Sequence, residues 1–131
     1  MKNNSRKTWA AEWFTKAADD ELSAQDLLKE KGGSPNTICF LSQQMAEKYL
    51  KGYLIYCGKD FPKVHQLPFL RKLCEKHSPK FKKIKKETEF LTIFYIATRY
   101  PGEFPSFSFK DAEKAFKNAR AIKELVLEEM I

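Results

Sequence analysis

Apolar residues recur along most of this chain at intervals of three and four positions, the spacing that puts them on one side of an α-helix. Glycine and proline residues interrupt the pattern between segments. The segments that carry the helical pattern are residues 8–31, 34–58, 66–76, 79–99 and 109–130. No segment alternates convincingly as a strand does, so the sequence predicts an all-α fold, an up-and-down four-helix bundle with an additional short helix. The length predicts a single domain over residues 1–131.

The second segment is predicted to be the most enclosed helix. Ile38, Met45 and Tyr49 make one apolar face, and further apolar residues spread around most of the circumference. The remaining polar positions form a narrow wedge, made of Gln44, Glu47, Lys48 and Lys51. A polar stripe on an enclosed helix either contacts water between neighbouring helices or lines a binding site. These four residues are therefore candidates for a binding site.

A second polar stripe follows the segment 79–99 and consists of Thr88, Thr92, Tyr95 and Arg99. We expect the two stripes to face each other across a groove that Tyr100 closes. Arg99 would contact phosphate there, together with Lys48 or Lys51. Tyr95 or Tyr100 would stack on a base.

A purely structural interpretation competes with this groove. Glu47 and Lys51 also have the i, i+4 spacing of an exposed ion pair on a helix. Arg99 would then satisfy carbonyl groups at the end of its helix or neutralise Glu21. The residues alone do not decide between the two interpretations.

Two acidic residues, Asp20 and Glu21, lie inside the apolar arc of the segment 8–31, which also holds Trp9 and Leu22. A buried carboxylate is costly unless it is paired. We therefore expect at least one of the two to meet an arginine, a lysine or a tryptophan N–H of another helix. A role for Glu21 in ligand binding is the alternative.

Charge narrows the class of partner. The net charge of +7 favours anionic partners, such as nucleic acid, nucleotides or an acidic protein. Part of the excess is local, in Lys76, Lys80, Lys82, Lys83, Lys85 and Lys86. We interpret these lysines first as a solvated basic helix end, with a phosphate-binding patch as the alternative.

The remaining composition predicts location and assembly. Three widely spaced cysteines predict reduced, buried thiols, and we expect neither a metal nor a cofactor. The sequence shows no signal peptide and no membrane-spanning run, which predicts a cytoplasmic protein without a membrane partner. Eleven Phe, five Tyr and two Trp exceed what the interior of a small bundle takes, so part of them should cover a symmetric homodimer interface.

Residues 39–51, with the sequence CFLSQQMAEKYLK, resemble the second helix of HEPN domains, in their short stand-alone prokaryotic form. Further similarities occur in the same order as in the family and extend the resemblance over nearly the whole chain. They are Trp13, Glu21-Leu22, Ala24 and Leu27 in the opening helix, then Pro62 with His65, Leu67 and Leu70, then Arg99-Tyr100-Pro101.

The resemblance implies a four- to five-helix up-and-down bundle, commonly a homodimer, often associated with a minimal nucleotidyltransferase in a toxin–antitoxin or related complex. Many relatives are metal-independent ribonucleases, with an arginine followed after four to six positions by a histidine. Arg99 matches the arginine, but residues 100–108 contain no histidine. Leu41 also stands where the family frequently has a histidine in its second helix.

Cleavage of RNA needs a proton carrier, and arginine is a poor one because its pKa is above about 12. We therefore predict a non-catalytic nucleotide- or nucleic-acid-binding HEPN domain that acts as a homodimer, with a minimal nucleotidyltransferase as its partner. The predicted ligand-binding residues are Gln44, Glu47, Lys48, Lys51, Tyr95, Arg99 and Tyr100, with Glu21 and His65 as accessory candidates.

Two alternatives stay open. A pure interaction scaffold would expose aromatic residues around Phe104, Phe107 and Phe109 and would tolerate Arg99→Ala. A ribonuclease with a displaced histidine would need the fold to bring His65 close to Arg99. The second histidine, His77, lies in the basic segment.

Overall fold

The computed structural model of the protein describes residues 2–100, 102 and 106–130, with the side chains of residues 2–4 excepted. All regular structure in these residues is helical, which confirms the predicted fold class. The elements are α1 (Lys2–Glu30), α2 (Pro35–Tyr56), α3 (Leu67–Glu75), the 3-10 helix η1 (Pro79–Ile84), α4 (Lys85–Thr92), α5 (Phe94–Ala97) and α6 (Phe109–Glu128). No helix in these residues is long and apolar enough to cross a membrane.

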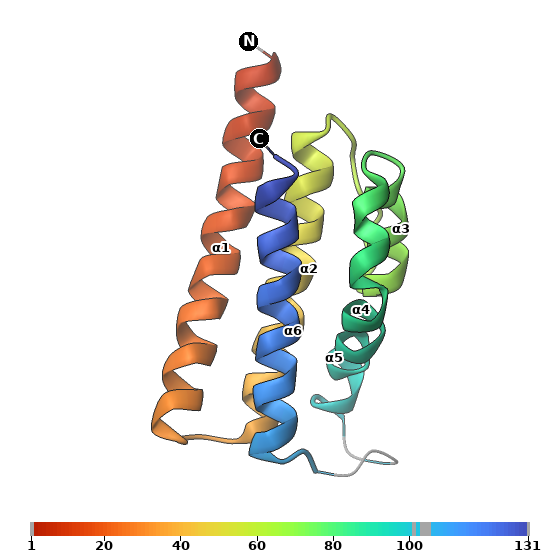
Figure 1. The fold of residues 1–131 in the computed structure, drawn as a ribbon. Helices are drawn as coiled ribbons and strands as arrows, with labels where there is room; N and C mark the ends of the chain where they lie inside the picture. Colours follow the sequence, from red (N-terminus) through yellow and green to blue (C-terminus); the bar gives the residue numbers. More distant parts are fainter. Residues whose placement is uncertain (1, 101, 103–105, 131) are drawn as a thin grey trace.

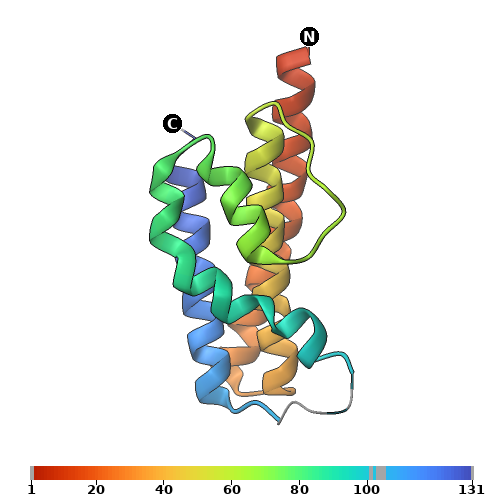
Figure 2. The same ribbon diagram turned by 90° about the vertical axis from the view of Figure 1, so that its right-hand side faces the viewer.

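The long helices α1, α2 and α6 lie side by side, and the shorter elements from α3 to α5 cover the side of the bundle away from α1 (Figure 1). Turned by a quarter, the bundle shows η1, α4 and α5 descending in one bent path, with α3 beside its upper part (Figure 2). Helix α2 contacts every other α-helix. It is therefore the element around which the others are arranged.

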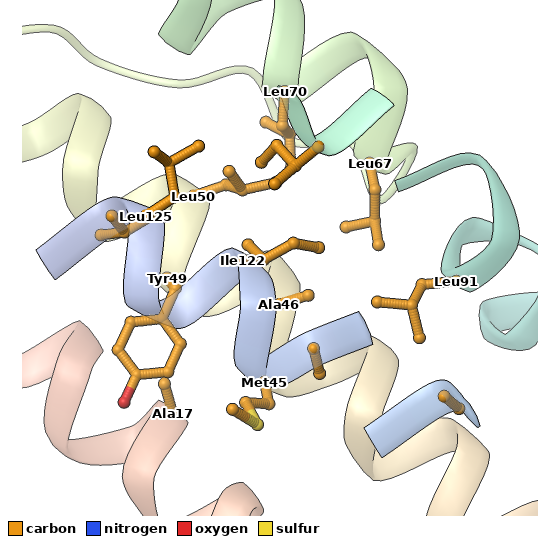
Figure 3. Close-up of a cluster of buried hydrophobic side chains, with 14 of the residues drawn as sticks. Ala17, Met45, Ala46, Tyr49, Leu50, Leu67, Leu70, Leu91, Ile122 and Leu125 are labelled. Carbon is orange, nitrogen blue, oxygen red and sulfur yellow. The ribbon is translucent and has the colours of Figure 1, made fainter. Parts of the chain in front are cut away.

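The core confirms the prediction that α2 is the most enclosed helix. Fourteen of its 22 residues are buried. Met45, Ala46 and Leu50 contribute to a cluster that also receives side chains from four other helices (Figure 3). These further side chains are Ala17 of α1, Leu67 and Leu70 of α3, Leu91 of α4, and Ile122 and Leu125 of α6.

Local sequence explains where the helices begin. Ser34 accepts a hydrogen bond from the Asn36 N–H, and Pro35 occupies the first position of α2. Ser108 and Asp111 form a capping box at the start of α6, because each side chain accepts from the other residue's backbone N–H at 3.1 and 2.9 Å. These ends follow from residues close in sequence, without help from tertiary contacts.

The segment 79–99 is not the single helix that its periodicity predicts. It divides into η1, α4 and the one-turn α5, with a break at Ile93. The β-branched pair Thr92 and Ile93 has low helix propensity, and the Thr92 hydroxyl accepts a hydrogen bond from the Leu67 N–H at 3.0 Å. The bend keeps Leu91 and Phe94 in the core on both sides of the break.

Several apolar residues lie outside the core, contrary to the predicted arc of α1. Trp9 is exposed and Leu22 is 60% exposed, because α1 is an edge helix that packs mainly on α2. Around the loop before α6 the opposite holds. Phe107 and Phe109 are half-buried, and the Phe107 ring packs edge-on against Phe94 at 4.9 Å, so they are not the exposed aromatics expected of a scaffold. Phe104 is outside the described residues.

A test of the α1–α2 packing is the substitution Gly52→Ala. A β-carbon at position 52 would lie 2.5 Å from Cε1 of Phe14, whose ring stacks on Tyr49. We expect a net loss of about 1 kcal/mol in the free energy of unfolding, since overpacking outweighs the higher helix propensity of alanine. Urea denaturation measures it. In a Phe14→Ala background the same change should be neutral or stabilising, and an equal loss in both backgrounds would contradict the contact.

Candidate functional site

A buried carboxylate lies at the centre of the polar residues of α2. Glu47 is 5% exposed and accepts hydrogen bonds from Gln43 Nε2 and Lys51 Nζ, both at 2.9 Å. Its two oxygens also lie 3.0 Å from Nδ1 of His65. Because a buried charge is costly unless it is paired and hydrogen-bonded, these partners are what permit Glu47 to stand inside the bundle.

The ammonium group of Lys51 is buried with this carboxylate. It lies 4.9 Å from the centre of the Phe61 ring and 5.9 Å from that of Trp13. The two rings pack edge to face at 5.2 Å. Lys51 is therefore enclosed by a carboxylate on one side and aromatic rings on another.

The contact with Glu47 fixes the orientation of His65. A carboxylate beside Nδ1 selects the form in which Nδ1 carries the hydrogen, so that Nε2 is the ring nitrogen left for other partners. The backbone is held as well, because Gln43 Nε2 reaches the His65 carbonyl oxygen at 3.5 Å and the Leu67 N–H donates to Thr92. The His65 side chain is still 42% exposed.

The histidine ring connects the buried carboxylate to the surface. It stacks on Tyr95 with ring centres 3.9 Å apart and planes 13° apart. The guanidinium carbon of Arg99 lies 4.7 Å from the Tyr95 ring centre and 5.5 Å from that of Tyr100. Tyr95 thus contacts both His65 and Arg99, and we call His65, Tyr95, Arg99 and Tyr100 the aromatic–arginine cluster.

A small cavity of about 160 Å³ lies beside this cluster. It is lined by Arg99 and Thr98 after α5, and by Asn36, Thr37 and Phe40 in the first turns of α2. The N-terminus of a helix carries partial positive charge. An exposed guanidinium beside it makes this end of the bundle favourable for an anion.

The structure brings together only part of the predicted ligand-binding set. Glu47, Lys51 and the aromatic–arginine cluster form one connected group. Gln44 reaches it indirectly, through the bond from its Nε2 to Gln43 Oε1 at 2.7 Å. Thr88 is buried and donates its hydroxyl hydrogen to backbone carbonyls of its own helix.

Lys48 does not join this group. It donates to Asp20 of α1 at 2.6 Å and lines a separate cavity of about 480 Å³ with Trp9, Trp13 and Lys16. Within the described residues, Arg99 neither lines this cavity nor pairs with a residue that does. The expectation of one groove shared by Lys48 and Arg99 is corrected, because one step along α2 is a rotation of about 100°, which brings Lys48 to Asp20 of α1 while Glu47 points towards His65.

Glu21 has a structural partner. Its carboxylate accepts from Lys123 Nζ of α6 at 2.8 Å and lies 3.7 Å from Arg120 Nε. Together with the pair of Asp20 and Lys48, this confirms that the acids inside the arc of α1 meet basic residues of other helices.

The sequence analysis did not predict that Glu47 is the common partner of Gln43, Lys51 and His65. It also did not predict the contact of His65 with Tyr95. The sequence does contain a sign of the first arrangement, since Gln43, Glu47 and Lys51 follow at intervals of four on a helix that is otherwise mostly apolar. For the histidine–tyrosine contact we find no signal in a single sequence. The two residues are 30 positions apart and meet only through the bent path of α4 and α5.

Two further kinds of chemistry have little support in the described residues. They contain no group of three or more His, Cys, Asp or Glu side chains arranged to hold a metal ion. Burial raises the pKa of the Cys39 thiol to about 12, so this cysteine carries a proton at neutral pH and is a poor nucleophile.

Comparison with known proteins places these features in a family. The family model for the HEPN domain matches residues 10–130. Two similar solved structures are TT1696 from Thermus thermophilus and ST0689, which is described as an archaeal HEPN homologue. Each is 26% identical to this chain with a TM-score of 0.75, and the match covers 93% of this chain and 98% of the other. The comparison with curated proteins gives no match. The family model and the HEPN homologue agree with the resemblance of residues 39–51, and this chain belongs to the HEPN domain family.

Proposed function

We propose that this HEPN domain is a non-catalytic binding module for a nucleotide or nucleic acid, and that the phosphate-bearing ligand binds at the aromatic–arginine cluster. The observation that carries the proposal is the placement of Arg99 against Tyr95 and Tyr100, beside the first turns of α2. A cation next to two aromatic rings provides contacts for both parts of a nucleotide, the phosphate and the base.

The chemistry of each member supports this assignment. Ion pairs hold Arg6, Arg71 and Arg120 within the described residues, whereas Arg99 is exposed and contacts tyrosine rings. Its planar guanidinium group is suited to bidentate contact with phosphate oxygens. Tyr100 is 58% exposed and offers a ring on which a base can stack.

The other predicted ligand-binding residues do not contact the ligand in this proposal. Glu47 and Lys51 are buried and hold His65 in place, and Gln44 bonds to Gln43 behind them. Lys48 and Glu21 have no part in the cluster, since each is paired between α1 and another helix.

The proposed cluster is tested by Arg99→Ala. Hydrogen bonds to charged groups contribute about 1.5–3 kcal/mol, so the affinity for a labelled nucleotide should fall by roughly 10- to 100-fold. Fluorescence anisotropy measures it. Arg120→Ala, which removes an equal charge from the exposed face of α6, should bind as wild type does. Equal affinity of wild type and Arg99→Ala would end the proposal and favour the interaction scaffold.

The homodimer is proposed on a different observation. Exposed apolar side chains gather near the junction of α4 and α5, where Ile93 and Ile96 lie three positions apart, and Phe69 is exposed on the adjoining α3. Apolar surface of this kind is typical of interfaces, and a second copy presenting the same surface would cover it symmetrically. A minimal nucleotidyltransferase is the proposed further partner, on the resemblance of residues 39–51 to stand-alone HEPN proteins.

Sedimentation of Ile96→Glu tests this interface. Ile96 is 55% exposed, so the substitution leaves the core intact and places a charge in the proposed contact. We expect the variant to sediment as a monomer at concentrations where wild type is dimeric. Leu127→Glu on α6 is the matched control, because Leu127 is also an exposed apolar residue, and it should remain dimeric. A wild type that is monomeric throughout would contradict the homodimer.

A ribonuclease with a displaced histidine is the second candidate, and one observation favours it. His65 is oriented by Glu47 through Nδ1, and its ring shares Tyr95 with Arg99. In this arrangement Nε2 would take the proton of a 2′-hydroxyl group while its oxygen bonds to phosphorus and the bond from phosphorus to the 5′-oxygen breaks. The leaving oxygen would take a proton from water, and Arg99 would stabilise the charge on the phosphate.

Incubation with total RNA separates the two candidates. The binding module predicts no cleavage by wild type. The ribonuclease predicts cleavage that falls about 10²- to 10⁴-fold in His65→Ala, the usual contribution of a positioned proton carrier. His77→Ala is the control, because His77 is an exposed histidine outside the cluster. Cleavage that is independent of His65 would contradict both candidates.

A further inference from the structure

The surface formed by the end of α3, by η1 and by the start of α4 is strongly basic. Its lysines are all exposed, and the elements that carry them lie on the side of the bundle away from α1 (Figure 1). They are Lys76, Lys80, Lys82, Lys83, Lys85 and Lys86, which we call the lysine face. Within the described residues, Lys80 pairs with Glu129 at 3.5 Å, and the other five form no ion pair.

The backbone arrangement explains why these lysines point outward. Phe81 and Ile84 are buried, three positions apart on a 3-10 helix whose side chains repeat every three residues. Their burial anchors η1 to the bundle. Lys82 and Lys83 between them are consequently turned to solvent.

Two of the lysines are placed unfavourably for the helix that carries them. Lys85 and Lys86 occupy the first turn of α4, where the helix dipole repels cations at a cost of about 0.3–1 kcal/mol each. The acidic residue of this turn, Glu87, offsets part of this cost. A bound polyanion would relieve the repulsion between the helix dipole and these two lysines.

The surroundings favour a nucleic acid over a protein partner. None of the exposed large apolar residues in the described chain lies between positions 70 and 92. Protein interfaces have an apolar, aromatic core and are depleted in lysine. Contact with nucleic acid, in contrast, depends mainly on lysine and arginine side chains that neutralise phosphates.

We propose that the lysine face binds the phosphate backbone of a polynucleotide. The inference rests on the proposed function and deepens it, because it makes the phosphate-bearing ligand a nucleic-acid strand and not a mononucleotide. From Lys86 to Arg99 the chain advances by on the order of 20 Å at helical rise, which is too far for one nucleotide. A strand of several nucleotides reaches both the lysine face and the aromatic–arginine cluster.

The test compares two triple variants with the same net charge. Lys82→Gln/Lys83→Gln/Lys86→Gln removes part of the lysine face, and Lys7→Gln/Lys29→Gln/Lys117→Gln removes three exposed lysines of α1 and α6. The probes are a fluorescein-labelled oligouridylate of about 16 nucleotides and a labelled uridine mononucleotide. Anisotropy titrations over a series of potassium chloride concentrations give the dependence of log K on log salt.

We expect the lysine-face variant to lower the magnitude of the salt slope for the oligonucleotide by about 2, since each phosphate contact on a single strand contributes about 0.7. Mononucleotide binding should be unchanged, and the control variant should keep the wild-type slope. Equal slopes for the two variants would overturn the proposal, because net charge alone would then explain binding. Competition by oligoglutamate as effective as by unlabelled oligouridylate would also overturn it, in favour of an acidic protein.

The result also distinguishes this inference from the proposed function. If Arg99→Ala binds both probes as wild type does while the lysine-face variant loses its salt slope, the aromatic–arginine cluster is excluded and the lysine face is supported. If Arg99→Ala weakens both probes while the lysine-face variant retains the wild-type slope, the cluster is supported and the lysine face is excluded.

Discussion

Glu47 is a buried carboxylate on a mostly apolar helix, so its charge must be satisfied by neighbouring side chains. Three side chains lie within hydrogen-bonding distance of it. Gln43 and Lys51 come from the neighbouring turns of α2, and His65 comes from the connection to α3. If one partner were lost, the charge would be buried with fewer hydrogen bonds, which costs several times more than an exposed ion pair contributes. The position of His65, and through it the stack with Tyr95, therefore depends on the requirement to satisfy Glu47.

Periodicity and capping residues were sufficient to predict the bundle. The apolar circumference of α2 and the box formed by Ser108 and Asp111 depend on residues close in sequence, and each is present in the structure. Helix α1 ends just before Gly32, although the residue in the left-handed conformation there is Lys31, with φ at 50°. The same rules failed in the segment 79–99. There a hydroxyl of Thr92 bonds to a residue 25 positions away, and no local pattern reports such a contact.

The sequence predicted several residues of the candidate site, but it did not predict how these residues are arranged. The spacing of Tyr95 and Arg99 correctly placed them together, since four positions make one helical turn. It did not reveal which neighbour each polar residue of α2 meets. Glu47 and Lys48 are adjacent in sequence, yet one contacts His65 and the other contacts Asp20, so polar residues that form one continuous stripe on a helical wheel have different partners.

Helix α5 is a single turn, and of its four residues only Phe94 and Ala97 are buried. The break at Ile93 separates this turn from the longer helix that precedes it. Ile96 is the exposed residue of α5, so its substitution disturbs few packing contacts, whereas Tyr95 stacks on His65. A one-turn helix at the end of the bundle can therefore change its exposed side chains while the packing of the other helices is kept.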